Sequence, residues 1–338
     1  MDGLILQVLN GLDKGGAYAL IALGLTLTFG TLGVVNFAHG ALFMLGAFCA
    51  VTLQAALTIS TRVRDESITF FEAYKEIPYL VTWFGDTGAT IIDWVVPLSV
   101  LVTIPFMLLV GVIFERGLIR FFYKRSHAEQ ILVTFGIAIV AQELIKAFFG
   151  ANPIPVQAPE IVQGSADIGA WFGLSGNLSY PWWRLVYLAS AAIIIGAVFA
   201  FLNLTTYGMV VRAGMADRET VQLLGINIQR RFTIVFGIAA VAAGVAGALY
   251  TPILPPNYHI GMDFLVLSFV VVVVGGMGSL PGAVAAGFLL GILQSFASLN
   301  EVKDILPGID QIIIYLVAVV VLLARPRGLL GRKGVMEA

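Results

Sequence analysis

Residues 262–299 read MDFLVLSFVVVVVGGMGSLPGAVAAGFLLGILQSFASL. The valines at 270–274 are apolar on every side, without the alternation that a membrane β-barrel strand requires. A helix needs about 20 mostly apolar residues to cross roughly 30 Å of hydrocarbon. The second half of the stretch approaches that length, whereas the first half is shorter and need not cross fully. Glycine, serine and proline at 275–282 separate the halves. The stretch therefore predicts membrane helices with a break between them.

Apolar runs of this kind recur along the whole chain. We expect nine spans within a range of eight to ten, because the runs around 15–58 and 262–299 are interrupted. The runs fall near residues 15–32, 40–58, 95–114, 130–149, 184–203, 232–250, 262–274, 282–299 and 309–324. The expected fold is all-α, a polytopic transmembrane helical bundle with broken helices, forming one domain over 1–338 in a lipid bilayer.

The composition excludes several classes of protein. Of the 338 residues, 59% are hydrophobic and 12% are charged, whereas an ordinary soluble domain has about 25% charged residues. A soluble enzyme or a disordered tail of this length would need more charge, and a net charge of −1 gives no field to attract nucleic acid. The single cysteine, Cys49, provides neither a disulfide framework nor a thiol metal site.

Motifs for enzymatic chemistry are absent from the sequence. None of the lysines follows a glycine, so the chain has no G-K-[ST] phosphate loop. His39, His127 and His259 form no H-E-x-x-H pattern, and no serine lies in G-x-S-x-G. We therefore expect no catalytic residues, no metal site and no cofactor, and a protein that is not an enzyme.

Basic residues predict the direction of the spans. The segments 116–125, 212–231 and 325–333 together hold twelve of the nineteen Lys and Arg residues. Cytoplasmic loops carry such an excess. With nine crossings all three segments fall on one side, which predicts a cytoplasmic C-terminus. The loops 59–94 and 150–183 then lie outside.

The outer loop 59–94 allows two interpretations. Phe70, Phe71, Tyr74 and Ile77 recur at helical spacing, which predicts a short helix on the membrane interface. A solvated loop with scattered aromatic residues is the alternative.

Ionisable residues within the spans are few. Glu143 and Lys146 are three residues apart on one helical face and are interpreted as a self-neutralising structural pair, with a role in ion coupling as the alternative. Asp263 lies at the mouth of a span, where solvation explains it. The pattern argues against an ion-driven pump.

Two breaks in the hydrophobic pattern have the same form. Segments 33–41 and 275–283 each contain a glycine, six residues and then Gly-Ala opening an apolar helix. Membranes tolerate such breaks where the backbone is buried in protein or lines a cavity. Tight packing of glycines is the alternative. The candidate pathway residues are Asn36, His39, Gly40, Gly275, Gly276, Gly278, Ser279 and Pro281.

The inner loop 204–231 contains a short amphipathic segment at 217–224, which ends at Gly225. Val221 and Leu224 are placed on one apolar face, which must lie on the membrane or dock in a groove of another protein. The residues of interest in this loop are Arg212, Asp217, Arg218, Glu219, Leu224 and Gly225.

At these residues the chain resembles the Liv-type permeases of bacterial branched-chain amino acid ABC importers. NFAHG at 36–40, LGIN at 224–227, VGGMGSLPGA at 274–283 and PRGLLG at 326–331 match motifs of that family in order. Loop 59–94 is longer than is usual for it. The resemblance implies a permease of the bacterial inner membrane, and it implies that 204–231 is a coupling loop for an ATPase.

The resemblance also implies partners: a second homologous permease, giving a heterodimer, two cytoplasmic ATPase subunits and a periplasmic substrate-binding protein. It implies import of branched-chain or other neutral amino acids. Relatives that import urea, amides or aromatic acids keep those substrates open. An ion-coupled secondary transporter and a channel or structural subunit are the competing classes.

Overall fold

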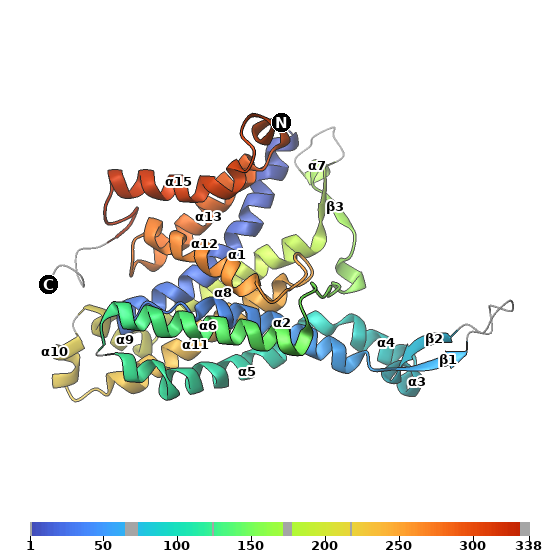
Figure 1. The fold of residues 1–338 in the computed structure, drawn as a ribbon, viewed down its shortest axis with the longest axis horizontal. Helices are drawn as coiled ribbons and strands as arrows, with labels where there is room; N and C mark the ends of the chain where they lie inside the picture. The colour runs from blue at the N-terminus through green and yellow to red at the C-terminus, as the bar shows by residue number, and fades with distance from the viewer. Residues whose placement is uncertain (1, 65–73, 124, 172–177, 217, 332–338) are drawn as a thin grey trace.

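The computed structural model describes residues 2–64, 74–123, 125–171, 178–216 and 218–331, which form a helical bundle with a projecting hairpin (Figure 1). Its α-helices are α1 Asp2–Leu32, α2 His39–Leu57, α3 Tyr79–Phe84, α4 Asp86–Asp93, α5 Val95–Gly117, α6 His127–Phe149, α7 Ile168–Trp171, α8 Trp182–Leu204, α9 Thr206–Ala216, α10 Arg218–Leu223, α11 Ile228–Tyr250, α12 Ile260–Gly275, α13 Leu280–Ala297, α14 Asn300–Ile305 and α15 Ile309–Ala324. The 3₁₀ helices are η1 Ile119–Phe122 and η2 Glu160–Val162, and the strands are β1 Ser60–Arg64, β2 Tyr74–Pro78, β3 Ser165–Asp167 and β4 Ser179–Pro181.

Each of the nine apolar runs lies on a helix. Six stretches of the described chain are long and apolar enough to cross a membrane; they lie on α2, α5 with η1, α6, α8, α11 and α13. The helices α12 and α15 are apolar but shorter, at 16 residues each. The 31-residue α1 runs diagonally through the bundle (Figure 1) and is buried along most of its second half. The all-α membrane fold is confirmed.

Two peripheral helices are polar inside and apolar outside. The buried stripe of α5 includes Ser99, Thr103, Met107, Gly111 and Glu115, and that of α6 consists of Gln130, Thr134, Ala138, Gln142 and Ile145. Large apolar side chains on the opposite faces are exposed, as Leu132 at 72% and Phe148 at 82% illustrate. A soluble bundle has the reverse pattern. These outer faces therefore suit contact with lipid.

Small residues bring the inner helices together. A side chain at Gly46 of α2 would lie 2.0 Å from the Gly244 carbonyl oxygen of α11, and one at Gly287 of α13 would lie 2.8 Å from the Ala19 backbone of α1. Lipid tails are as apolar as Leu, so association inside a membrane depends on such close packing. Backbone contact between helices therefore stabilises the core around α1.

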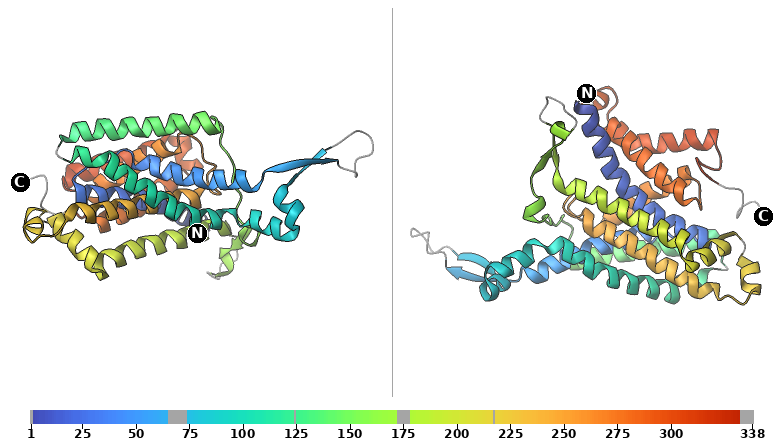
Figure 2. Two further views of the ribbon diagram at one scale, coloured as in Figure 1. Left: turned by 90° about the horizontal axis from the view of Figure 1, so that it is seen from below. Right: turned by 180° about the vertical axis from the view of Figure 1, so that it is seen from behind.

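The segments between helices gather at two ends of the bundle (Figures 1 and 2). At one, the hairpin end, β1–β2 projects and the Ile154 amide donates to the Pro256 carbonyl at 3.0 Å. At the other, the α10 end, lie α9, α10 and residues 325–331 (Figure 2). The loops that nine crossings would place on one side of the membrane therefore lie together at one end of the bundle.

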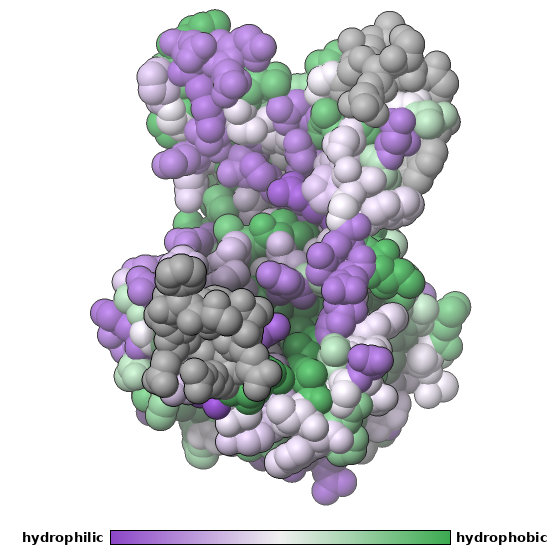
Figure 3. All heavy atoms as spheres, turned by 90° about the vertical axis from the view of Figure 1, so that its right-hand side faces the viewer, coloured by the Kyte–Doolittle hydropathy of each residue, from purple (hydrophilic) through white to green (hydrophobic). Residues whose placement is uncertain are grey.

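The segment 59–94 differs from both sequence-based interpretations. Its strands β1 and β2 pair antiparallel, with Arg62 opposite Glu76, and α3 and α4 follow. Tyr74 and Ile77 lie in β2, so the helical spacing was wrong there, while Phe70 and Phe71 lie outside the described residues. Figure 3 looks onto this end, where hydrophilic residues cover the raised parts and hydrophobic residues show in the hollow between them.

Glu143 and Lys146 form the expected ion pair at 3.5 Å. Both side chains are about half exposed, at 56% and 43%, and the ammonium also lies 5.1 Å from the centre of the Tyr258 ring. This arrangement agrees with the structural interpretation of the pair.

Candidate functional site

The first break holds Asn36 in a fully buried position between α1 and α2. Its Oδ1 accepts from the Ala38 amide at 3.0 Å, while its Nδ2 has no hydrogen-bond partner among the described residues. Next to it, the Phe37 amide donates to Thr134 Oγ1 of α6 at 3.0 Å. Ala38 is the N-cap of α2, and its side chain makes no capping hydrogen bond. Asn36 therefore closes a turn before the helix.

His39, the first residue of α2, is fully buried, and neither ring nitrogen has a hydrogen-bond partner within the part of the chain that the structure describes. The imidazole lies against Gly24 of α1, where an added Cβ would be 2.2 Å from Nε2. The missing side chain at Gly24 therefore makes the space that the ring fills. A buried, unpartnered imidazole costs free energy in a sealed core, so it marks a place where a polar partner would be stabilising.

Gly40 packs α2 on α12. A Cβ there would lie 2.1 Å from the Gly261 carbonyl oxygen and 2.6 Å from Leu265 Cβ. Gly40 thus serves helix packing, as the alternative interpretation of the glycines expected.

The second break, between α12 and α13, is a tight glycine turn. Gly276 and Gly278 have positive φ angles of 102° and 82°, a conformation that other residues rarely adopt. Ser279 is the N-cap of α13, with its Oγ accepting from the Gly282 amide at 3.2 Å, and Pro281 occupies the first turn, where a missing N–H is harmless. A side chain at Gly275 would lie 2.5 Å from the Gly282 backbone.

The end of the described chain lies on this turn. The Leu329 amide donates to the Val274 carbonyl at 2.8 Å and the Leu330 amide to the Gly275 carbonyl at 3.1 Å. The last carbonyls of a helix have no partner within the helix. We call residues 325–331 the C-terminal strap, because they supply those partners from outside α12.

Both breaks meet the inner loop at the α10 end. A Cβ at Gly30 of α1 would lie 2.5 Å from Met215 Cε of α9 and 3.6 Å from Gly278 Cα of the second break. Val34 of the first break and Val221 of α10 belong to one buried cluster, with Ile119 and Phe232. Residues predicted from three separate stretches are therefore joined by packing.

The inner loop forms α9 and α10, and Gly225 follows α10 with a positive φ of 78°. Val221 is 6% exposed, whereas Leu223 and Leu224 are 88% and 73% exposed. Val221 and Leu224 therefore do not share one uncovered face, because the cluster of the chain itself takes Val221. The uncovered apolar pair is Leu223 and Leu224, of which the sequence pattern missed Leu223.

Arg212 has a local structural role in α9. Its Nη1 donates to the Leu202 carbonyl and, at 2.9 Å, to Asn203 Oδ1, at the end of α8. Asp217 lies outside the described residues, and the side chains of Arg218 and Glu219 on α10 are not described either.

A buried carboxylate at the α10 end was missed by sequence reasoning. Glu115, 1% exposed, accepts from the Tyr123 hydroxyl and, at 2.7 Å, from Thr233 Oγ1 of α11. The available signal was its spacing of four residues from Gly111, along the polar stripe of α5.

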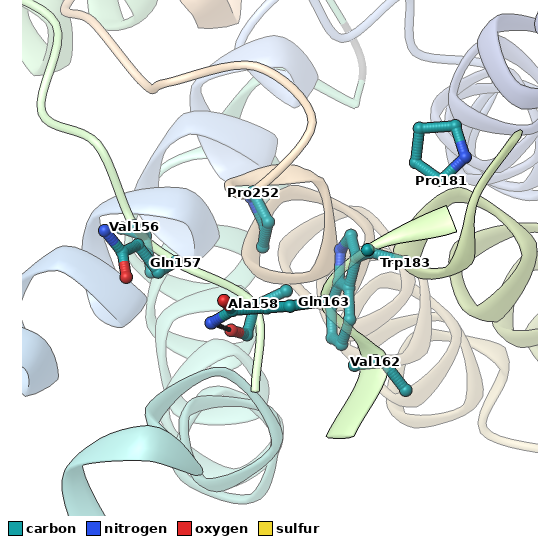
Figure 4. A pocket seen from close by; sticks show the side chains of 9 residues that line it. Val156, Gln157, Ala158, Val162, Gln163, Pro181, Trp183 and Pro252 are labelled. Carbon is teal, nitrogen blue, oxygen red and sulfur yellow. Dashed lines mark hydrogen bonds between the residues drawn. The ribbon is translucent and has the colours of Figure 1, made fainter. Parts of the chain in front are cut away.

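A pocket of about 400 Å³ at the hairpin end has no charged residue in its wall (Figure 4). Trp183 fixes one side, because its indole N–H donates to the Leu249 carbonyl at 3.1 Å. Gln163 is held by its bond to the Ala158 carbonyl at 2.7 Å. Pro252 closes the wall from the end of α11 (Figure 4). Among the described residues, no group of His, Cys, Asp and Glu is placed to hold a metal ion.

Helices that are apolar outward, with two breaks packed against the loop 204–231, define a multi-pass membrane protein. A family model described as "Branched-chain amino acid transport system / permease component" matches residues 7–322. The chain belongs to that family, and it is a permease component.

Individual relatives agree with this family. The chain is 28% identical to the high-affinity branched-chain amino acid transport system permease protein LivH of Salmonella typhimurium, over 96% of this chain and 95% of that protein. The LivH protein of Escherichia coli K12 gives the same values. Identity to the corresponding protein BraD of Pseudomonas aeruginosa is 29%, with the same coverage. No solved structure matches the chain.

Proposed function

We propose that this chain is the membrane-spanning subunit of a binding-protein-dependent importer of branched-chain amino acids, powered by ATP hydrolysis in separate cytoplasmic subunits. The family match over residues 7–322 carries the proposal. The names of LivH and BraD supply the substrate class. The C-terminus and the α10 end face the cytoplasm, and the hairpin end faces the binding protein.

In this proposal α10 is the element that docks on an ATPase subunit. Leu223 and Leu224 are exposed apolar side chains at the tip of the inner loop, and a helix of this kind fits an apolar groove. Val221 and Met215 then transmit a displacement to the first break and to the end of α1, because both are packed there.

We propose that the breaks at 33–38 and 276–279 act together as an inner gate. Asn36 and His39 would face the solute path when α1 and α2 separate. The unpartnered Asn36 Nδ2 and His39 ring nitrogens support this role, because an open gate would give them water or solute to bind. The partner permease is a homologous chain, giving a heterodimer.

Reconstitution tests the proposed function. The chain is co-purified with the proposed second permease and ATPase subunits, placed in liposomes, and supplied with binding protein and labelled leucine. We expect ATP-dependent uptake, inhibited by isoleucine and valine and less by urea, amides or aromatic acids. Preferred uptake of one of those solutes would change the substrate. Uptake by this chain alone under an ion gradient would overturn the proposal.

A further inference from the structure

A second pocket at the hairpin end lies where α1 and α8 begin and α13 ends. Its volume is about 440 Å³. The lining residues are Leu6, Gln7, Asn10, Lys14, Ser179, Tyr180, Pro181, Arg184, Ser295 and Ser298. Eight of these ten carry a polar side chain or a charge.

The charged groups in the wall of this pocket are both cations, Arg184 and Lys14. Arg184 is held in place from behind by Asp13, whose side chain is 1% exposed and whose Oδ2 lies 3.0 Å from Arg184 Nη1. The same nitrogen donates to Asn10 Oδ1 at 3.3 Å. A guanidinium has five N–H donors, so donors remain on Nε and Nη2 of a side chain that is 31% exposed.

Lys14 adds a cation that is not neutralised. Within the described residues its ammonium has no ion-pair partner inside 4.0 Å, and the nearby Asp310 is taken by Lys303 at 2.9 Å. With Asp13 set against Arg184, the wall has a surplus positive charge. Lys14 directly follows Asp13 in the sequence of α1, where α1 crosses α13.

The neutral groups favour a small polar ligand. Ser295 donates to Gln7 Oε1 at 2.6 Å, which fixes the orientation of the Gln7 amide. The phenol of Tyr180 lies beside Arg184 and is neutral at pH 7, and burial raises its pKa further, to about 12. Leu6 and Pro181 supply the apolar part of the wall.

We propose that this pocket binds the carboxylate of the transported solute on the side where the binding protein releases it. The planar fork of Arg184 matches a carboxylate, and Lys14 adds the charge that a single paired arginine lacks. This inference rests on the proposed function. The competing source of an anionic group is a lipid headgroup.

The test measures ligand binding to the full-length chain in phosphatidylcholine nanodiscs by saturation-transfer NMR. The probes are leucine, 4-methylvalerate, which keeps only the carboxylate, and leucinamide, which keeps only the ammonium. We expect leucine and 4-methylvalerate to bind and leucinamide to bind about tenfold more weakly, as the loss of a charge-assisted hydrogen bond predicts. Lys14→Gln should weaken both carboxylates to a similar extent.

Lys146→Gln is the control, because that lysine pairs with Glu143 on α6 and lies outside the pocket wall. The double variant Asp13→Asn/Arg184→Gln removes the buried pair together, leaves no lone buried charge, and should abolish binding of both carboxylates. Equal binding of leucinamide, or full binding by Lys14→Gln, would overturn the proposal. So would a Lys14→Gln effect that is confined to retention of phosphatidylglycerol in discs containing that lipid.

Failure of the proposed function would look different. A complex that imports leucine at the wild-type rate with Lys14→Gln would overturn the carboxylate site alone. A wild-type complex that imports no leucine would overturn the proposed function, whatever the NMR experiment shows.

Discussion

The absence of a side chain at Gly24 determines where the His39 ring can lie. The imidazole occupies the space beside α1 that any larger residue at Gly24 would fill. Both residues lie in the buried core, where overpacking is resisted because interiors are already close-packed. The position of the His39 ring in the core therefore depends on the absence of a side chain at Gly24.

Gly24→Ala should destabilise the folded chain. The new methyl group would meet His39 Nε2 at 2.2 Å, and overpacking of this kind costs about 1–3 kcal/mol. The measurement is the thermal unfolding midpoint of the purified chain in detergent. Gly16→Ala on the same helix is the control, because its methyl group would meet Ala191 at an ordinary 3.5 Å. Restoration of the midpoint by His39→Ala in the Gly24→Ala background would identify the ring as the cause, and equal midpoints for both single variants would refute it.

The sequence alone singled out Asn36 and His39, because polar residues between apolar runs are conspicuous. It could not supply Gly24, since the chain contains 37 glycines and their close contacts are set by how helices cross. Glu115 was missed for a related reason. Its partners Tyr123 and Thr233 come from other elements, and only the packed bundle brings them together.

At the scale of elements, α10 combines a packed side and an uncovered side within six residues. Val221 should behave as a core residue although it lies on a surface loop. Val221→Ala is expected to lower stability by about 1–3 kcal/mol, through the lost methyl groups and the cavity they leave. Leu224→Ala should leave the unfolding midpoint of the isolated chain unchanged and weaken co-purification of the ATPase subunit. The reverse assignment of the two effects would contradict the observed burial.

Gly225 sets the end of α10. With φ at 78°, a β-branched residue there is disfavoured by about 1–2 kcal/mol. Gly225→Val should therefore distort the tip of the loop and reduce the stimulation of ATPase activity by the binding protein, while the chain still inserts in the membrane. Gly225→Asn tolerates the left-handed conformation better and should retain more of the stimulation. Full stimulation in Gly225→Val would mean that the loop is not the docking element.

The long apolar runs predicted the positions of nine helices, whereas helical spacing failed at Tyr74 and Ile77, which lie in a strand. The aromatic residues there suit either a helix or a strand over so short a distance. Cross-strand pairing, as between Arg62 and Glu76, determined the outcome, and pairing between distant residues leaves little trace in local spacing.

For the whole molecule, the separation of loops into two ends predicts one orientation in the membrane. After Cys49→Ser, a cysteine at Trp83 should react with an impermeant maleimide only from outside, and one at Leu223 only from the cytoplasm. Both side chains are well exposed, at 73% and 88%, so neither is protected by its own chain. Reaction of both cysteines from the same side of the membrane would contradict the orientation that nine spans predict. Co-expression of the ATPase should then shield Leu223→Cys and leave Trp83→Cys unaffected.

The C-terminal strap has a consequence for the order of synthesis. The carbonyls of Val274 and Gly275 receive their partners from Leu329 and Leu330, which are translated after both α13 and α15. The carbonyls of Val274 and Gly275 therefore lack these partners while the ribosome makes α13 and α15, and they gain them only after residues 329 and 330 have been added. A chain terminated before residue 329 would insert α13 and α15 but leave two carbonyls at the end of α12 without their partners.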